Sequence, residues 1–369
     1  MTETTERKSP AISALASVSH DKDVDGLASA AIACRYAKKN GLPYAVSLTD
    51  YGSFGNAFST VAGLRNTLIV VTDLGIDIES VGLVSEALRR AVAQGCRVVW
   101  LDHHRWPEKC LKVVLSLGNK PVLKMRHDLC AAEIAFRVLM PDDPVSESLA
   151  RIAHDTDFNL RQIDAATALT DALSVIRFSA IERKEDVTQA LRSLLDKLID
   201  EGIAGLWNEQ AGRFKDDLLE RRVSNYRKEK LKKMRKALEG HRDMDIHGRL
   251  VRVVEIPLGV TTTDLGTFAS DENNLRSIYQ GLRAADLLVT LSPGGMLGFR
   301  RTRENVSCNE AAKLFKGGGH PYAAGGEYGL YEDFEAASAD IFHVLSSSTD
   351  WVVKESTPTA VEVTPSHEQ

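Results

Sequence analysis

The chain has 369 residues, of which 43% are hydrophobic and 26% are charged. These values are ordinary for a globular protein of two or three domains, and they exclude a disordered or collagen-like chain. The formal charge of -5 argues against a global polyanion-binding surface, although a local basic face remains compatible with it. No apolar run approaches the roughly 18 residues that a membrane span needs. Five dispersed cysteines predict reduced thiols. We therefore expect a cytoplasmic protein without membrane contact.

The first half of the chain alternates between strand and helix patterns. Short, largely apolar runs predict strands at 12–18, 44–48, 67–71 and 96–101, of which 67–71 is β-branched. Apolar residues at helical spacing predict helices at 26–40 and 78–94. Strands separated by helices of this length form β-α-β units and a parallel sheet. Such a sheet binds ligands beyond the C-terminal ends of its strands.

The second half changes in character. Residues 160–242 are expected to be helical, and the basic stretch 213–242 has apolar residues at helical spacing. We interpret that stretch as a solvated connector with one packed face, and a guide for nucleic acid is the alternative. A third domain is expected to start near His247, with strands at 249–256, 287–291 and 296–302.

Acidic and imidazole residues follow three of the predicted strands. In chain order these residues are His20, Asp21, Asp23 and Asp25, then Asp73, then Asp102, His103 and His104. A further acid, Asp155, lies in a short apolar context. A solvated loop or helix cap would explain one such residue alone, but four clusters together indicate a site.

Carboxylates gathered at one sheet edge repel one another, and divalent cations remove that conflict. A mixture of carboxylates and imidazoles suits Mn²⁺, Fe²⁺ or Zn²⁺ better than Ca²⁺. Two metals about 3.5–4 Å apart would need a bridging carboxylate, and Asp73 is placed for that role. Such a pair can activate a water and stabilise charge on a phosphate oxygen.

These motifs resemble the DHH phosphoesterase family, in its RecJ- and NrnA-like branch. The Asp102-His103-His104 triplet carries the family name. The H-x2-D-x-D-G run at 20–26, the strand-end Asp73 and the D-T-x-F run at 155–158 follow in the expected order. The run at 317–326, Gly-Gly-Gly-His-Pro-Tyr-Ala-Ala-Gly-Gly, resembles the signature of the DHH-associated C-terminal domain.

The resemblance implies an α/β fold with a parallel-sheet N-terminal domain and a metal site at the strand C-termini. A helical connector and a smaller α/β C-terminal domain would follow. We place the metal-binding phosphoesterase domain at 11–165, the connector at 166–243 and the substrate-binding domain at 244–348. Residues 355–369, rich in Thr, Pro, Ser and Glu, are predicted to be a disordered tail.

The resemblance also implies a role for each motif residue. Asp23 and Asp25 would each hold one ion of a Mn²⁺ pair, with Asp73 bridging the two. His103 and Asp155 would complete the second position. His104 would contact the scissile phosphate, and Asp102 would orient the histidines.

One position is open between two residues. Relatives place the remaining ligand of the first metal either four or two residues before the first Asp of the D-x-D run. Here His20 stands three residues before Asp23 and Asp21 stands two before it. Spacing favours Asp21 slightly, and His20 is a near-equal candidate.

The C-terminal motif predicts a phosphate-binding loop. Gly317, Gly318 and Gly319 allow close backbone approach and could present N–H groups to a phosphate, with His320 as a side-chain donor. The residues from Ala323 onward are interpreted as the start of a small-residue helix. Arg300 matches a position where relatives carry an Arg for a nucleotide phosphate, and a surface Arg is the alternative.

We therefore predict a Mn²⁺-dependent phosphodiesterase or exonuclease with two ions, for which Mg²⁺ or Co²⁺ could substitute. It would hydrolyse single-stranded DNA or RNA, or short oligonucleotides, to mononucleotides by metal-activated water. One alternative is a cyclic-dinucleotide phosphodiesterase or an adenosine 3′,5′-bisphosphate phosphatase. Another is a non-catalytic replication-complex scaffold. The sequence leaves polarity, substrate length and oligomeric state open, with a homodimer among the options.

Overall fold

The computed structural model describes residues 11–50, 54–117 and 122–353. Contacts divide the chain into two compact units, and the boundary falls between Tyr226 and Arg227, inside one long helix. The predicted tail at 355–369 lies outside the described residues. In the described part of the chain, none of the helices combines the length and apolar character that crossing a bilayer requires.

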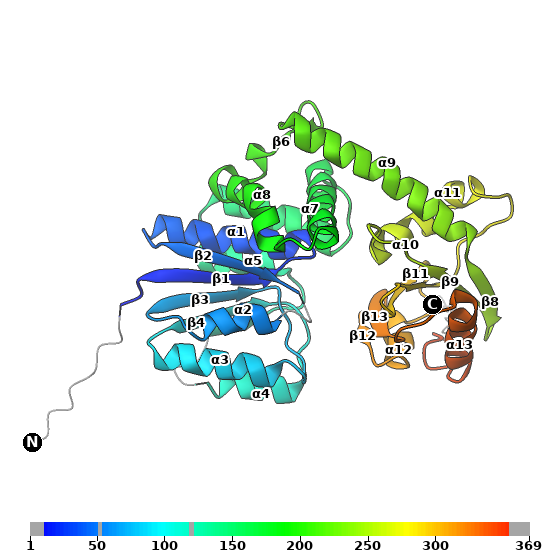
Figure 1. The fold of residues 1–369 in the computed structure, drawn as a ribbon, viewed down its shortest axis with the longest axis horizontal. Coiled ribbons are helices and arrows are strands. Elements are labelled where there is room, and N and C mark those ends of the chain that lie inside the picture. The colour runs from blue at the N-terminus through cyan, green and yellow to red at the C-terminus, as the bar shows by residue number, and fades with distance from the viewer. Residues whose placement is uncertain (1–10, 51–53, 118–121, 354–369) are drawn as a thin grey trace, which may run out of the picture. The chain divides into compact units, whose positions relative to one another are not determined.

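Unit 1 is built on a parallel five-stranded sheet in the order β2-β1-β3-β4-β5 (Figure 1). Its strands are β1 (Ala14–His20), β2 (Tyr44–Thr49), β3 (Thr67–Thr72), β4 (Arg97–Asp102) and β5 (Val122–Met125). The helices of its first part are α1 (Val24–Lys39), α2 (Phe54–Val61), α3 (Val81–Ala93), α4 (Glu108–Leu115), α5 (Ala131–Leu139) and α6 (Pro144–Asp157). The predicted parallel α/β architecture is confirmed.

Helices cover both faces of this sheet. One core contains α1, α5, α6, α7 (Asp164–Glu182) and α8 (Val187–Glu201), and the other contains α2, α3 and α4 (Figure 1). Side chains along β3 alternate between the two, since Ile69 and Val71 belong to the second core and Val70 to the first. Burial on both faces explains why β3 is a continuous apolar run.

The connecting region is mostly helical, as predicted, with one short exception. After α8 come the 3-10 turn η1 (Gly202–Gly205) and a small hairpin of β6 (Trp207–Asn208) and β7 (Arg213–Phe214). The basic stretch then forms α9 (Asp217–Glu239). The predicted helical character of 213–242 is therefore wrong at its start, where Phe214 and Trp207 instead pack edge to face.

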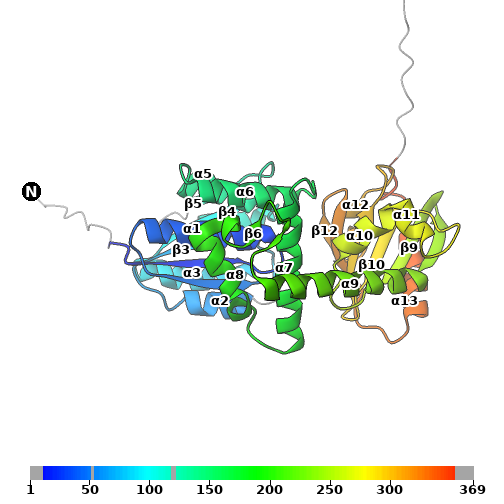
Figure 2. The same cartoon turned by 90° about the horizontal axis from the view of Figure 1, so that it is seen from above.

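Unit 2 is built on a mixed six-stranded sheet in the order β12-β13-β11-β10-β9-β8. Figure 2 labels three of these strands, β9, β10 and β12. The strands of unit 2 are β8 (Arg242–Ile246), β9 (Arg249–Glu255), β10 (Leu287–Leu291), β11 (Met296–Arg301), β12 (Gly318–Gly319) and β13 (Ala323–Glu327). Its helices are α10 (Thr262–Ser270), α11 (Glu272–Arg276), α12 (Cys308–Lys313) and α13 (Phe334–Ser346). The predicted strands at 287–291 and 296–302 form an antiparallel pair.

Residues 323–327 form strand β13, so the predicted helix start at Ala323 is wrong. The run pairs with β11 on one side and with β12 on the other. Its small residues do serve close backbone approach, because a Cβ on Gly317 would lie 2.0 Å from the Gly325 carbonyl oxygen. The close approach was predicted correctly, but it occurs within a sheet.

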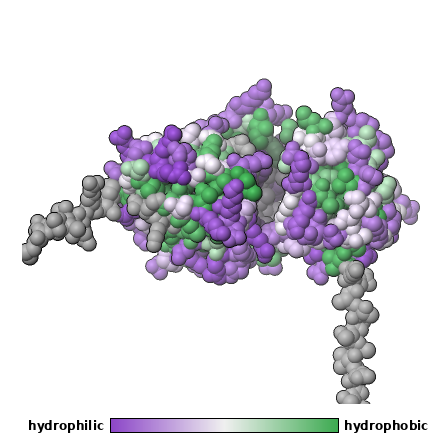
Figure 3. Space-filling model, turned by 90° about the horizontal axis from the view of Figure 1, so that it is seen from below, coloured by the Kyte–Doolittle hydropathy of each residue, from purple (hydrophilic) through white to green (hydrophobic). Residues whose placement is uncertain are grey.

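The face of unit 1 shown in Figure 3 mixes hydrophobic and hydrophilic residues. Exposed apolar side chains of unit 1 include Ile78, Leu83 and Leu115. Exposed apolar residues of this kind are ordinary on globular proteins.

The close approach at Gly317 gives a test of unit 2. We expect Gly317→Ala to destabilise the protein by about 1 to 3 kcal/mol, since backbone must shift to accept the added methyl group. Gly318→Ala is the matched control, because the nearest atom to its Cβ would be Asn309 Oδ1 at 3.7 Å. Chemical denaturation of both variants measures the difference, and equal stabilities would contradict the strand pairing described here.

Candidate metal centre

The candidate site lies where the order of the strands reverses, at the C-terminal ends of β1 and β3. The chain steps from β1 to β2 on one side and to β3 on the other, so the ends of β1 and β3 form a topological switch point. His20 ends β1, Asp73 follows β3, and Asp102 ends the adjacent β4. The parallel pairing thus gathers the three sequence clusters at one sheet edge.

The first donor group contains His20, Asp23 and Asp73, with one potential ligand atom from each within 4.8 Å of the others. His20 Nδ1 lies 2.9 Å from Asp23 Oδ2 and 3.4 Å from Asp73 Oδ2. Asp23 also caps α1, because its Oδ1 accepts a hydrogen bond from the Gly26 N–H. A Cβ on Gly26 would lie 2.3 Å from the His20 carbonyl oxygen, so only glycine lets α1 start this close to β1.

The second donor group surrounds His103. Its Nε2 lies 3.3 Å from Asp73 Oδ1 and 3.8 Å from Asp25 Oδ2, and its Nδ1 lies 3.6 Å from Asp157 Oδ2. The N-terminus of α5 holds Asp25 in place, since Ala131 and Ala132 each donate a backbone hydrogen bond of 2.7 Å to its carboxylate. A carboxylate at a helix N-terminus is also favoured by the helix dipole.

Asp73 connects the two groups. Its Oδ2 faces His20 and its Oδ1 faces His103. The side chain is only 3% exposed, yet Oδ2 accepts no hydrogen bond from the described residues. The backbone of Asp73 has φ +55°, a left-handed conformation uncommon outside glycine and found preferentially at functional positions. A buried oxygen without a donor fits a bound cation.

Without a bound cation, the pKa values of three groups in this cluster are raised, which favours their protonated forms. Burial lowers the pKa of His103, but its hydrogen bond to Asp73 and the charge of Asp157 outweigh burial and raise that pKa to about 10. Burial and the repulsion from Asp73 raise the pKa of Asp157 to about 6, against the attraction of His103. Burial, then Asp73 and Asp157, raise the pKa of Asp25. All three shifts favour the protonated, less negative form of the cluster.

The donor chemistry fits divalent cations. Carboxylate oxygens and imidazole nitrogens are the ligands that Mn²⁺, Fe²⁺ and Zn²⁺ share, and Mg²⁺ accepts the oxygens. One position would be held by His20, Asp23 and Asp73. Around His103 the structure offers two overlapping donor groups, one of Asp73, His103 and His104 and one of Asp25, His103 and Asp157.

His104 is oriented by a buried carboxylate. Its Nδ1 lies 2.7 Å from Asp102 Oδ1, and the indole N–H of Trp106 donates a 2.6 Å hydrogen bond to Asp102 Oδ2. Burial alone would raise the pKa of the fully buried Asp102, but hydrogen bonds from His104 and Trp106 lower it overall. For His104, burial lowers the pKa and the bond to Asp102 raises it by more. The structure thus places Asp102 in contact with both His104 and Trp106.

Asp21 lies in none of the donor groups, against the slight preference that spacing gave it. Its Oδ1 accepts a 2.8 Å hydrogen bond from Arg177 Nε on α7. The same guanidinium reaches Asp50 at 3.4 Å, and Lys22 lies 2.8 Å from Asp50. His20 therefore takes the place beside Asp23.

Sequence reasoning missed Asp50, whose Oδ1 lies 3.5 Å from His20 Nε2. The signal was present, because Asp50 comes two residues after the end of a predicted strand, as Asp73 does. Burial raises its pKa, but His20 and Lys22 lower it by more.

Asp155 also lies outside the donor groups. Its carboxylate accepts hydrogen bonds from the backbone N–H of Gln162 at 2.9 Å and of Ile163 at 3.4 Å, which fixes the turn after α6. Asp157 occupies the position near His103 that the sequence analysis gave to Asp155. Both lie in the last turn of α6, where residues two apart point to different sides of the helix.

The predicted phosphate loop lies in unit 2 and is largely occupied by its own contacts. The N–H of Gly317 bonds to the Ala312 carbonyl and the N–H of Gly319 to Asn309 Oδ1. Two of the three glycine N–H groups are therefore engaged by neighbouring residues of unit 2. The exposed His320 ring stacks on Tyr322 with centroids 5.1 Å apart and planes 3° from parallel.

Arg300 lies on β11 and is partly buried. Its two terminal nitrogens donate to the Phe299 carbonyl at 2.8 Å and to Thr263 Oγ1 at 2.7 Å. Burial lowers its pKa. These bonds hold the guanidinium plane in one orientation, with further N–H donors left over.

Comparison with known families identifies unit 1. Residues 16–170 match the family model described as DHH family, N-terminal domain. This part of the chain therefore matches the DHH family, and the resemblance predicted from the motifs within it is confirmed. No curated protein matches the chain.

Solved structures share the fold at low sequence identity. RecJ in complex with Mn²⁺ from Thermus thermophilus is 18% identical with a TM-score of 0.56, and the match covers 93% of this chain and 53% of that one. A manganese-bound exonuclease RecJ is 18% identical with a TM-score of 0.52, covering 91% and 90%. The pGpG-specific phosphodiesterase PggH from Vibrio cholerae is 11% identical with a TM-score of 0.50, covering 91% and 100%. The chain thus spans about half the length of the Thermus RecJ.

The exchange of roles between Asp155 and Asp157 can be tested directly. We expect Asp157→Asn to weaken Mn²⁺ binding at the His103 position, because a charged ligand is lost. Asp155→Asn should keep full metal content but lose about 1 to 3 kcal/mol of stability, because two backbone donors lose a charged acceptor. Metal analysis after dialysis and chemical denaturation measure both effects. Loss of metal from Asp155→Asn alone would contradict the assignment.

Proposed function

We propose that this protein is a metal-dependent phosphoesterase that hydrolyses phosphodiester bonds in single-stranded nucleic acid or short oligonucleotides. The observation that carries the proposal is the sharing of Asp73 between two donor groups at the sheet edge. A shared carboxylate between two cation positions is the arrangement used for phosphoryl chemistry by paired divalent ions. When bound, such a pair polarises a water molecule and phosphate oxygens.

His104 is proposed as the proton donor to the leaving group. Asp102 engages Nδ1, so Nε2 is the nitrogen that can present a proton to substrate. The raised pKa of His104 favours the protonated imidazole from which that proton comes. As the P–O bond breaks, transfer from Nε2 to the departing oxygen would neutralise its developing charge. Trp106 and Asp102 would keep the ring in the required orientation.

Unit 2 is proposed to hold the nucleotide end of the substrate. The fixed Arg300 guanidinium can accept a phosphate with its remaining donors. The parallel His320 and Tyr322 rings offer an exposed surface on which a base can stack. In this proposal Gly317, Gly318 and Gly319 determine the shape of the loop, and His320 contacts the base of the substrate.

A dinucleotide substrate is the second candidate. The favouring observation is the likeness to the pGpG-specific phosphodiesterase, whose whole length the match covers. A short substrate also agrees with the net charge of -5, since a long polyanion would be repelled by it. The presence of donor groups that could hold a metal ion supports catalysis over a scaffold role.

The test is a time course with Mn²⁺ on end-labelled RNA and DNA of two, five and twenty-four nucleotides. We expect hydrolysis to mononucleotides, with a drop of at least 100-fold in His104→Gln, since proton transfer contributes about 10² to 10⁴ to rate. Rapid loss of dinucleotides with long strands intact would select the second candidate. Absence of cleavage of every substrate by Mn²⁺-loaded protein would refute the proposal.

A further inference from the structure

A buried guanidinium lies beside the first donor group of the candidate metal centre. It belongs to Arg177 on α7, whose side chain is only 13% exposed. Its Nε donates a 2.8 Å hydrogen bond to Asp21 Oδ1, and its Nη2 donates one of 3.4 Å to Asp50 Oδ2. Asp21 comes directly after β1 and Asp50 directly after β2, and these strands are neighbours in the sheet. One arginine therefore connects the ends of two adjacent strands.

Asp50 is held through one of its oxygens and presents the other to His20. Lys22 Nζ lies 2.8 Å from Asp50 Oδ2, the same oxygen that accepts from Arg177. Asp50 Oδ1 lies 3.5 Å from the buried Nε2 of His20. The Lys22 side chain is half exposed, and an exposed lysine loses side-chain entropy when it is held in one geometry. The buried Arg177 is therefore the stronger anchor of Asp50.

The two ring nitrogens of His20 face different acids. Nδ1 lies 2.9 Å from Asp23 Oδ2 and 3.4 Å from Asp73 Oδ2, whereas Nε2 faces Asp50. An imidazole nitrogen that binds a cation carries no proton, so the proton of the neutral ring is on the other nitrogen. A carboxylate on the side of that proton keeps the ring in the orientation that ligation requires. Asp50 stands on that side of His20.

The same guanidinium keeps Asp21 outside the donor group. Arg177 engages an oxygen of Asp21, and Asp21 belongs to none of the donor groups found among the described residues. We propose that Arg177 is a positioning residue for the cation position of the first donor group, because it holds Asp50 behind His20 so that His20 presents Nδ1 to the ion. The inference rests on the proposed metal-dependent function and adds to it a residue that contacts neither the ion nor the substrate.

Calorimetric titration of metal-free protein with Mn²⁺ measures this role without turnover. We expect two ions per chain for the unaltered protein. Arg177→Gln should weaken the binding of one of them about tenfold or more, since loss of a group that orients a metal ligand lowers metal affinity by about 10- to 100-fold. Asp50→Ala should weaken the same ion, because it removes the carboxylate through which Arg177 acts.

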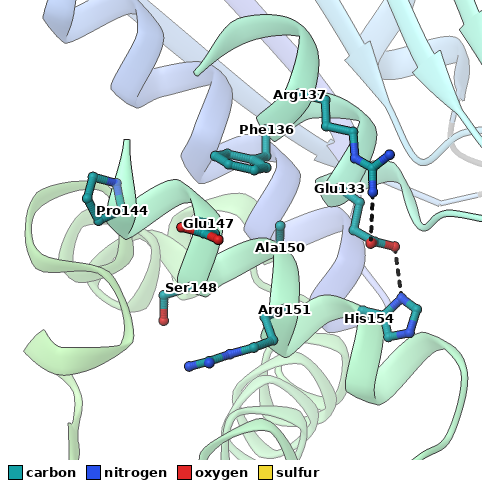
Figure 4. A pocket seen from close by; sticks show the side chains of 9 residues that line it. All are labelled: Glu133, Phe136, Arg137, Pro144, Glu147, Ser148, Ala150, Arg151 and His154. Carbon is teal, nitrogen blue, oxygen red and sulfur yellow. Dashed lines mark hydrogen bonds and ion pairs between the residues drawn. The ribbon is translucent and has the colours of Figure 1, made fainter. Parts of the chain in front are cut away.

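Two controls separate positioning from a structural effect. Arg35 is a unit 1 arginine of nearly equal burial, 14% exposed, that bonds to Asp143. Arg35→Gln should lower the stability to unfolding, as Arg177→Gln does, but leave the affinity for both ions unchanged. Arg151→Gln alters an exposed arginine at a separate cavity between α5 and α6 and should also leave both affinities unchanged (Figure 4). Unchanged affinity in Arg177→Gln or in Asp50→Ala, or an equal loss in Arg35→Gln, would overturn the inference.

Nitrogen chemical shifts of Zn²⁺-loaded protein with ¹⁵N-labelled histidine report which nitrogen of His20 carries the proton, and His20→Gln identifies the signals. We expect the proton on Nε2 in the unaltered protein and in Arg35→Gln. A proton on Nδ1 in the unaltered protein would overturn the inference while two-ion binding, and with it the proposed function, stands. Failure of the unaltered protein to bind any divalent cation would overturn both.

Discussion

Repulsion between buried carboxylates is the constraint on which unit 1 depends. The side chains of Asp25 and Asp73 are almost fully buried. The carboxylate of Asp157 lies close to the imidazole of His103, which also contacts Asp25 and Asp73. Placing such charges together without water is unfavourable unless donors or cations compensate. The protein supplies part of that compensation itself, through His20, His103 and the two backbone N–H groups of α5 that hold Asp25. Divalent cations would supply the rest.

The parallel sheet is what makes this concentration of charge possible. Its order brings the ends of β1, β3 and β4 side by side, so His20, Asp73 and Asp102 come from strands far apart in sequence. Buried apolar residues on both faces fix the register. A shift of one residue in β3 would point the apolar side chains to the wrong faces and displace Asp73. The rigid strands therefore position the donors, and the helix N-termini of α1 and α5 orient their carboxylates.

Much of this could be predicted from the sequence, and the failures have physical causes. The β3 run and Asp73 were evident because a buried strand and the acid that follows it are local features. The role of Asp157 was not evident from the sequence, because the choice between Asp157 and Asp155 depends on the direction in which each side chain points from α6. The pairing of Asp21 with Arg177 joins residues 156 positions apart, which no local pattern reports. Strand β13 was missed because its small residues carry no periodic signal, and only its pairing with β11 and β12 defines it.

The central claim is that Asp73 joins two cation positions, and calorimetric titration of metal-free protein with Mn²⁺ tests it most directly. We expect two ions per chain for the unaltered protein and weakened binding at both positions in Asp73→Asn, which keeps the shape of the side chain and removes its charge. Asp142→Asn, which alters an exposed acid between α5 and α6, should retain both ions. Two ions bound with unchanged affinity by Asp73→Asn would contradict the account, as would a single ion in the unaltered protein.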